Sequence, residues 1–230
     1  GITDSLDAEF MIARWDEPHW TQLGTGNGWI RNMYSLQDTM YTVGFLGGIN
    51  GVAVHRLARW NDPGFSTVGD TVTWFVSDFY CMEEYQEEIY VGGGFEFYSP
   101  INPSETGSTL NIMRWNGNYW REVGDGIPVD DIQNDGGVYG MKVYNNDLYV
   151  LGRFRKNDNV GSGIMKWDGE NYSEVGNSIN GPAIDAAVYR GELYVVGEFN
   201  HVGGSHSTEE GAIPAGGIAK WDGERWCALN

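Results

Sequence analysis

The chain contains few of the features that cross-link a fold or insert it into a bilayer. Of its 230 residues only two are cysteine, Cys81 and Cys227, and they stand in different sequence surroundings. We therefore expect two separate thiols and no disulfide framework. The best apolar run, residues 41–54, contains four glycines. It is shorter than the roughly 18 residues of a membrane span, so we expect no membrane insertion.

Basic residues are also scarce. The chain has 14 Lys and Arg against 32 Asp and Glu, a formal net charge of −18. Such a surface repels phosphate backbones and anionic headgroups, so we expect no nucleic-acid partner. Solubility in a salty medium is one reason for this acidity, and calcium-binding loops are another. Oxygen ligands for calcium gather at Asp130, Asp131, Asn134 and Asp135. We expect no other cofactor.

The sequence signatures of common enzyme classes are absent. There is no Gly-x-Ser-x-Gly elbow, no phosphate-cradling loop and no His-Glu-x-x-His motif. The glutamates at 83–84 and at 87–88 are adjacent, so in a strand the two carboxylates of each pair point to opposite faces. We expect a non-catalytic protein. A hydrolase or lyase that uses loop carboxylates with His201 or His206 is the enzymatic alternative.

What the chain has in abundance is glycine, aromatic residues and an internal repeat. It contains 34 Gly, 10 Trp, 13 Tyr and 9 Phe. A short phrase, in which Arg or Lys precedes Trp and Asp or Asn follows it, occurs five times. Its tryptophans lie 45, 55, 52 and 54 residues apart, at Trp15, Trp60, Trp115, Trp167 and Trp221. Self-similarity at a period of about 40–55 residues is typical of stacked-unit architectures.

Each full repeat predicts two β-hairpins. A Tyr-Val phrase that ends in Gly, as at 148–152 and 193–197, follows an alternating segment and predicts an inner hairpin. The tryptophan phrase and an aromatic residue five positions later predict an outer hairpin. Two-residue turns with positive φ favour Asn-Gly and Asp-Gly, and these pairs occupy the outer turns at 116–117, 168–169 and 222–223. Pro18 and Pro63 indicate a different turn in the first two repeats.

The predicted fold is all-β: a β-propeller of about five four-stranded antiparallel blades, with the first blade incomplete, in a single domain of residues 1–230. The first repeat supplies only an outer hairpin, residues 11–24. Residues 25–29 are expected to form a loop that links it to the next blade. The exposed face of a terminal blade is apolar, so we expect neighbouring segments, other copies or ring closure to cover it. The blades are expected at about 29–69, 78–124, 137–176 and 183–230.

One stretch carries a resemblance to a known family. Residues 193–199 read Leu-Tyr-Val-Val-Gly-Glu-Phe, a Gly-Gly pair stands at 203–204, residues 217–223 read Gly-Ile-Ala-Lys-Trp-Asp-Gly, and Trp226 and Leu229 follow. The pattern resembles the kelch-like, galactose-oxidase-type β-propeller repeats of large secreted or cell-surface bacterial proteins, over nearly the whole chain. This resemblance implies a propeller fold and an extracellular or cell-surface location. It implies no defined activity, because a fold alone does not determine function.

Functional residues are expected on the irregular loop face and along the central channel. Variable loops on a rigid scaffold carry function, and flat aromatic side chains beside polar groups suit sugar rings. The candidate ligand-binding residues are Trp29, Arg31, Trp74, Tyr98, Tyr139, Arg155, His201 and His206. Alternation along the innermost strands predicts channel-lining residues at Asn32, Cys81, Glu83, Lys142 and Asp185. It also predicts packed side chains at Met33, Met82, Met141 and Ala186.

Two groups among these candidates have side chains that could be reactive. His201 and His206 share the longest loop with Glu209 and Glu210, a set that could hold a transition metal if the loop folded back. Loop histidines are more often solvated, and we predict no metal site. Cys81 has no positive neighbour in the sequence that would lower its pKa, so we do not expect a nucleophile.

These observations favour an extracellular, non-catalytic binding or adhesion module that recognises a glycan or a protein through its irregular loop face. The alternative is a structural repeat unit of a larger surface or filament assembly. The first interpretation depends on the aromatic loops, and the second depends on the unmatched first hairpin.

Overall fold

The structure, a computed structural model, describes residues 8–69, 74–98, 108–129, 136–154, 163–204 and 211–229. At 74–77, 97–98 and 108–109 the description covers the backbone alone. The regular secondary structure of these ranges consists of β-strands, which confirms that the fold is all-β. None of the described ranges contains a helix with the length and apolar character that crossing a membrane requires.

The first sheet is the largest. Its order is β1-β2-β3-β5-β6, with β4 paired to β3 at one end. Its strands are β1 (Glu9–Asp16), β2 (His19–Leu36), β3 (Thr39–Ile49), β4 (Val52–Ala53), β5 (Leu57–Asn61) and β6 (Gly64–Thr67).

Three four-stranded antiparallel sheets follow along the chain, and each runs from an innermost to an outermost strand in sequence order. The second sheet has β7 (Trp74–Tyr85), β8 (Glu88–Tyr98), β9 (Ser108–Trp115) and β10 (Trp120–Glu122). The third has β11 (Gly137–Tyr144), β12 (Asp147–Arg153), β13 (Ile164–Trp167) and β14 (Tyr172–Glu174). The fourth has β15 (Ala183–Tyr189), β16 (Glu192–Gly197), β19 (Ile218–Trp221) and β20 (Trp226–Ala228). A two-stranded ribbon, β17 (His201–Val202) and β18 (Ile213–Pro214), accompanies it.

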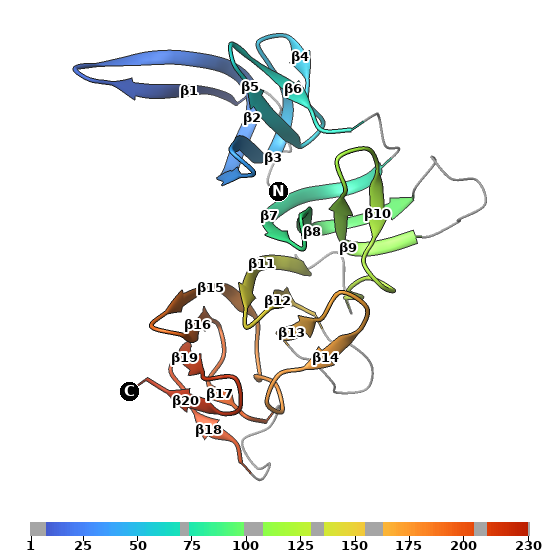
Figure 1. The fold of residues 1–230 in the computed structure, drawn as a ribbon, viewed down its shortest axis with the longest axis vertical. Helices are drawn as coiled ribbons and strands as arrows, with labels where there is room; N and C mark the ends of the chain where they lie inside the picture. Colours follow the sequence, from blue (N-terminus) through green and yellow to red (C-terminus); the bar gives the residue numbers. More distant parts are fainter. Residues whose placement is uncertain are drawn as a thin grey trace.

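The four sheets are arranged like successive blades of a propeller. Figure 1 shows them following one another along an arc, with β7, β11 and β15 turned towards its inner side. The innermost strands of neighbouring sheets contact one another, β7 with β11 and β11 with β15. The repeats therefore form blade-like antiparallel sheets, as the sequence predicts.

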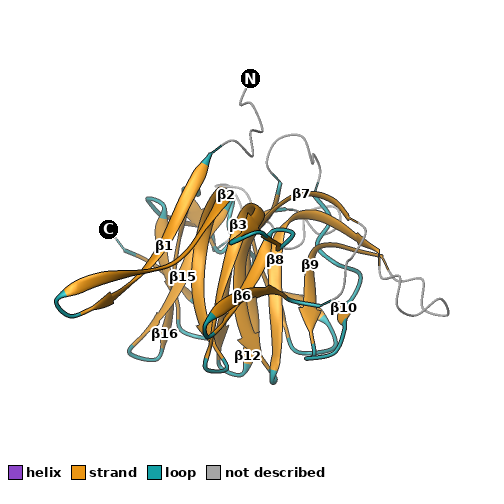
Figure 2. Cartoon of the chain, turned by 90° about the horizontal axis from the view of Figure 1, so that it is seen from above, coloured by secondary structure: helices purple, strands orange, loops and turns teal. Residues whose placement is uncertain are grey.

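The prediction for residues 11–29 is wrong in one respect. The expected loop at 25–29 is absent, because β2 runs without interruption from the outer hairpin into the innermost strand of the first sheet. Gly26 pairs with Phe10 on one edge of β2 and with Ile49 on the other. A Cβ on Gly26 would lie 2.5 Å from the Phe10 ring and 2.2 Å from the Gly48 carbonyl oxygen. Glycine thus permits the close packing that makes the strand continuous, and the hairpin projects from the sheet (Figures 1 and 2).

The predicted position of the later outer turns is also wrong. Asn116 N donates to the Tyr119 carbonyl at 3.4 Å and Asp222 N to the Arg225 carbonyl at 3.3 Å, so the Asn or Asp precedes the turn and is not one of its two central residues. The Asp222 carboxylate accepts hydrogen bonds from the backbone N–H groups of residues 224 and 225, at 2.8 and 2.7 Å. This side-chain capping organises a turn in which only the glycine has positive φ. In the first two repeats the Pro turns do span two residues, between His19 and Asp16 and between Asn61 and Gly64.

Adjacent sheets are joined by a contact that repeats along the chain. The two facing aromatic residues of an outer hairpin form what we call the docking pair. In the second, third and fourth sheets the docking pair packs on the end of the last strand of the preceding sheet. Trp120 Nε1 donates to the Val68 carbonyl at 3.2 Å, and Trp226 Nε1 donates to the Val175 carbonyl at 3.2 Å. In the third sheet Tyr172 Oη donates to the Val123 carbonyl at 3.0 Å.

The glycines that follow these carbonyls make room for the docking pair. A Cβ on Gly69 would lie 2.8 Å from Trp115, and one on Gly176 would lie 2.2 Å from Trp221. Both glycines also have positive φ, which disfavours other residues. The repeated valine-glycine pair is therefore part of the contact between sheets.

A second repeated contact joins the inner hairpins. Gln37 Nε2 donates to the Glu87 carbonyl at 3.0 Å, Tyr85 Oη to the Asn146 carbonyl at 3.0 Å, and Tyr144 Oη to the Gly191 carbonyl at 3.0 Å. In each case the acceptor lies in the inner turn of the next sheet. The carbonyl groups of these turns are thus bonded across the sheet interfaces, which ties each sheet to the next near the axis.

Candidate functional site

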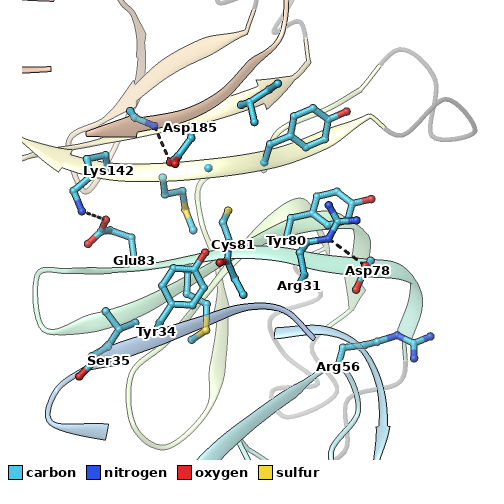
Figure 3. A pocket seen from close by; sticks show the side chains of 18 of the residues that line it. Arg31, Tyr34, Ser35, Arg56, Asp78, Tyr80, Cys81, Glu83, Lys142 and Asp185 are labelled. Atoms are coloured by element: carbon cyan, nitrogen blue, oxygen red, sulfur yellow. Dashed lines mark hydrogen bonds and ion pairs between the residues drawn. The ribbon is translucent and has the colours of Figure 1, made fainter. Parts of the chain in front are cut away.

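A pocket of about 1230 Å³ lies where the innermost strands converge. It is lined from β2, β7, β11 and β15, and Figure 3 shows it from close by. Eight of the thirteen site residues predicted from the sequence line this single pocket. They are Trp29, Arg31 and Tyr139 from the ligand-binding set, and Asn32, Cys81, Glu83, Lys142 and Asp185 from the channel-lining set.

The other five candidates are not among the pocket-lining residues. Arg155 and His206 lie outside the described residues, and only the backbone is described at Trp74 and Tyr98. His201 begins β17, away from the pocket lining, and its buried Nδ1 has no hydrogen-bond partner within the described ranges. The possible calcium ligands at 130–135, and Glu209 and Glu210, also lie outside the description. The described part of the chain holds no cluster of metal-ligating side chains.

A β-bulge in each innermost strand directs one side chain to the pocket. The register shifts by one residue between Ile30 and Asn32, and the corresponding shift recurs in β7, β11 and β15. A bulge re-aims the side chain of its extra residue. The residues at this repeated position are Arg31, Tyr80, Tyr139 and Ile184, and all of them line the pocket.

Aromatic and cationic groups gather at one end of the pocket, which we call the arginine end. The Arg31 guanidinium lies 4.2 Å from the centre of the Tyr80 ring, and the Arg56 guanidinium lies 3.7 Å from that of Phe45. Phe45 stacks on Trp29 with the ring centres 4.9 Å apart and an interplanar angle of 25°. Tyr139 lies two residues after the start of β11, and Arg31 and Tyr80 occupy the same repeat position. This end therefore lies on the side of the links between sheets, which is the irregular loop face.

Asp78 sets the electrostatics of the arginine end. Its carboxylate is buried, accepts a hydrogen bond from the Phe79 N–H at 2.9 Å, and lies 3.5 Å from Arg31 Nε (Figure 3). Burial raises the pKa of Asp78, and the nearby positive charges of Arg31 and Arg56 oppose that rise. The ion pair with Asp78 holds the Arg31 guanidinium in place, while nearly half of the Arg31 side chain remains exposed.

The opposite end of the pocket contains paired charges. Lys142 Nζ lies 2.7 Å from Glu83 Oε2, and this ion pair connects β11 to β7 (Figure 3). Asp185 accepts a hydrogen bond from the Ala186 N–H at 2.8 Å. These carboxylates are engaged in structural contacts, so this end is better suited to ordering water and polar ligand groups than to transferring protons.

Cys81 is a thiol and not a thiolate. Its side chain is buried between the second and third sheets, where Sγ lies 3.6 Å from the Val138 carbonyl oxygen. Desolvation by burial raises the pKa of Cys81 well above its ordinary value. A protonated, buried sulfur is a poor nucleophile, so Cys81 contributes packing and not covalent chemistry.

The prediction that Met33 is packed between sheets is wrong. Met82, Met141 and Ala186 are buried between sheets, as the alternation predicts, but Met33 is 45% exposed. Its equivalents face the innermost strand of a preceding sheet. No innermost strand precedes β2 within the described residues, so Met33 has nothing to pack against.

Sequence reasoning missed four residues of the arginine end: Phe45, Arg56, Asp78 and Tyr80. Tyr80 could have been found, because it occupies the same repeat position as Arg31 and Tyr139. Phe45 and Arg56 carry no comparable signal. Arg56 reaches the pocket from a turn in which both it and His55 have positive φ, a geometry that the sequence does not reveal.

Comparison with known proteins does not assign the chain to a family. No family model matches the chain, and no curated protein sequence does. Among solved structures, the computationally designed protein Ika8 is similar with a TM-score of 0.39 and 8% identity, over 92% of this chain and 77% of Ika8. YCF48, solved with a D1 peptide, has a TM-score of 0.37 and 13% identity, over 87% of this chain and 66% of its own. Neither likeness identifies a ligand or partner for this chain.

Proposed function

We propose that this chain is a non-catalytic, extracellular β-propeller module of the kelch-like type that binds a glycan at the arginine end of its central pocket. One observation carries the proposal: Trp29, Arg31, Tyr80 and Tyr139 come from three separate sheets and line one pocket. The bulges of β2, β7 and β11 bring the last three of these together. The extracellular location rests on the repeat pattern alone.

The chemistry of this end suits a sugar. Trp29 is partly exposed beside the pocket, and an indole face packs well against the C–H face of a pyranose ring. Arg31 offers guanidinium donors to hydroxyl or carboxylate oxygens, and its orientation is set by Asp78 and Tyr80. A volume of about 1230 Å³ is slightly larger than a typical small-molecule site, so the pocket has room for more than one sugar unit.

The first experiment is a binding screen of the purified chain against panels of neutral and acidic glycans and of surface proteins. We expect glycan hits and no protein hits. Affinities for a hit are then measured by calorimetry with Trp29→Ala and Arg31→Ala. Each variant should weaken binding by roughly 5- to 30-fold, because each removes a contact worth about 1–2 kcal/mol.

Arg153→Ala is the matched control. Arg153 also forms a half-exposed ion pair, with Glu198 at 3.2 Å, but it does not line the pocket. Its replacement should leave the affinity unchanged. Trp29→Ala separates binding from folding, because it leaves the Arg31–Asp78 pair intact. A blank result across both panels contradicts the proposal, and so does an equal loss of affinity in Arg31→Ala and Arg153→Ala.

The second candidate function is a structural repeat unit of a larger assembly. The observation that favours it is the projecting first hairpin, whose docking pair is exposed. Sedimentation of the isolated chain tests this function: a monomer at every concentration would remove its basis.

A further inference from the structure

The first docking pair has the geometry of the others but no sheet to pack on. The Trp15 and Trp20 rings lie 5.3 Å apart at 59°, compared with 5.2 Å and 52° for Trp221 and Trp226. Yet Trp15 is 52% and Trp20 67% exposed, whereas Trp221 and Trp226 are buried. The opposite face of the same hairpin, at Ile12, is buried against the first sheet. One face of the hairpin is therefore packed against the first sheet, and the other face is apolar and exposed to solvent.

The last sheet presents the complementary surface. In the third sheet Tyr149 is buried and its hydroxyl accepts a hydrogen bond from Trp221 Nε1 at 3.2 Å, and Leu151 beside it is also buried. The equivalent residues of the last sheet are Tyr194, which is half-buried, and Val196, which is exposed. Leu229 stands where Val123 and Val175 present their carbonyls to a docking pair, and it is only partly buried.

We propose that copies of this chain associate head to tail, with the Trp15–Trp20 pair of one copy packed on the β15–β20 sheet of a second copy. Trp15 Nε1 donates to the Tyr194 hydroxyl, and Trp20 Nε1 donates to the Leu229 carbonyl. The contact continues the series of three interfaces that the chain already forms between its own sheets. It is independent of the proposed glycan site.

The partner is a second copy, because one chain carries both the docking pair and the acceptor sheet but holds them far apart. Figure 1 shows the hairpin and the last sheet at the two ends of the arc. The described residues form no strand pairing between them. A head-to-tail contact uses two different surfaces, so it generates either a closed ring of copies or an open chain of copies. A ring buries the docking pair of every copy, and an open chain buries all but that of one terminal copy.

Analytical ultracentrifugation over a range of concentrations tests the proposal. The native chain should self-associate, and the double variant Trp15→Ala with Trp20→Ala should bind at least about 30-fold more weakly, because buried tryptophans dominate such interfaces. Val52→Ala is the control: it also removes an exposed apolar side chain, but Val52 lies on β4, which belongs to neither the docking hairpin nor the last sheet. It should associate like the native chain. A native chain that stays monomeric at every concentration overturns the proposal. This holds even if tryptophan fluorescence indicates that the indoles are buried.

A mixing experiment separates specific docking from misfolding. Val196→Arg places a charge on the acceptor sheet, and the double tryptophan variant lacks the docking pair, so each variant alone should be monomeric. Mixed together, the Val196→Arg copy still offers its hairpin and the tryptophan variant still offers its sheet. The two should form a one-to-one complex. A mixture that stays monomeric, or a tryptophan variant that associates like the native chain, overturns the proposal.

Discussion

The hairpin β1–β2 and the hairpin β9–β10 carry the same repeat phrase and hold their tryptophans in almost the same arrangement. The ring centres are 5.3 Å apart in the first and 5.2 Å apart in the second. Trp20 is nevertheless 67% exposed, while its equivalent Trp120 is 3% exposed. The hairpin alone therefore determines how the two rings face each other, and the preceding sheet determines whether they are buried.

This difference shows where the stability of the fold resides. A docking pair gains its hydrophobic free energy and its hydrogen bond only when a preceding valine-glycine pair receives it. The same principle applies to the inner hairpins, because Tyr144 has the next sheet's turn as its acceptor whereas Tyr189 is exposed. Neighbouring sheets, and not the repeat sequence itself, make the arrangement stable.

The largest effect is expected from removing equivalent tryptophans on the two hairpins. Trp120→Ala deletes a buried indole and its hydrogen bond to the Val68 carbonyl, so it should lower the free energy of unfolding by about 3–5 kcal/mol. Trp20→Ala should change it by less than about 0.5 kcal/mol. Urea denaturation measures both, at a protein concentration low enough to keep the chain monomeric. Equal losses would mean that the preceding sheet is not what stabilises the pair.

An intermediate effect is expected at the glycines that receive the docking pair. Gly176 has a φ of 51°, and a Cβ there would lie 2.2 Å from Trp221. Gly176→Ala should therefore cost more than about 2 kcal/mol, because it adds a steric clash to the cost of positive φ.

Gly191→Ala provides the matched control for this prediction. Gly191 has a φ of 78°, and a Cβ added there would meet no atom within 4 Å. Its replacement should therefore cost only the backbone contribution of about 1 kcal/mol. Thermal or urea denaturation gives the difference between the two variants. A difference near zero would show that the contact between sheets can relax around an added methyl group.

The repeat made much of the fold predictable. Its period of about 40–55 residues predicts stacked units, and the Tyr-Val and Trp phrases predict the hairpins that the structure confirms as antiparallel sheets. The prediction fails at residues 25–29. Their Thr-Gly-Asn-Gly composition indicates a turn, but β2 continues there because it is paired on both edges. Pairing with distant strands is not visible in local composition.

The candidate site was predictable to the extent that it follows the repeat. Alternation along the innermost strands locates Asn32 and Asp185 at the pocket, since these positions recur in each unit. Phe45 and Arg56 could not be found in this way, because a bulge in β2 and a turn with positive φ at 55–56 bring them beside Trp29. The bulge and the positive-φ turn therefore determine the part of the site that could not be predicted from the sequence.

The smallest effect is expected at the inner hairpins and gives the comparison its finest test. Tyr144 Oη donates to the Gly191 carbonyl in the next sheet at 3.0 Å, so Tyr144→Phe should cost about 1 kcal/mol. Tyr189 occupies the same position in the last sheet but is 55% exposed. Tyr189→Phe should therefore leave the free energy of unfolding unchanged within about 0.5 kcal/mol. Parallel urea titrations measure the two values. A loss in Tyr189→Phe as large as that in Tyr144→Phe would show that an acceptor covers the last sheet even in the monomer.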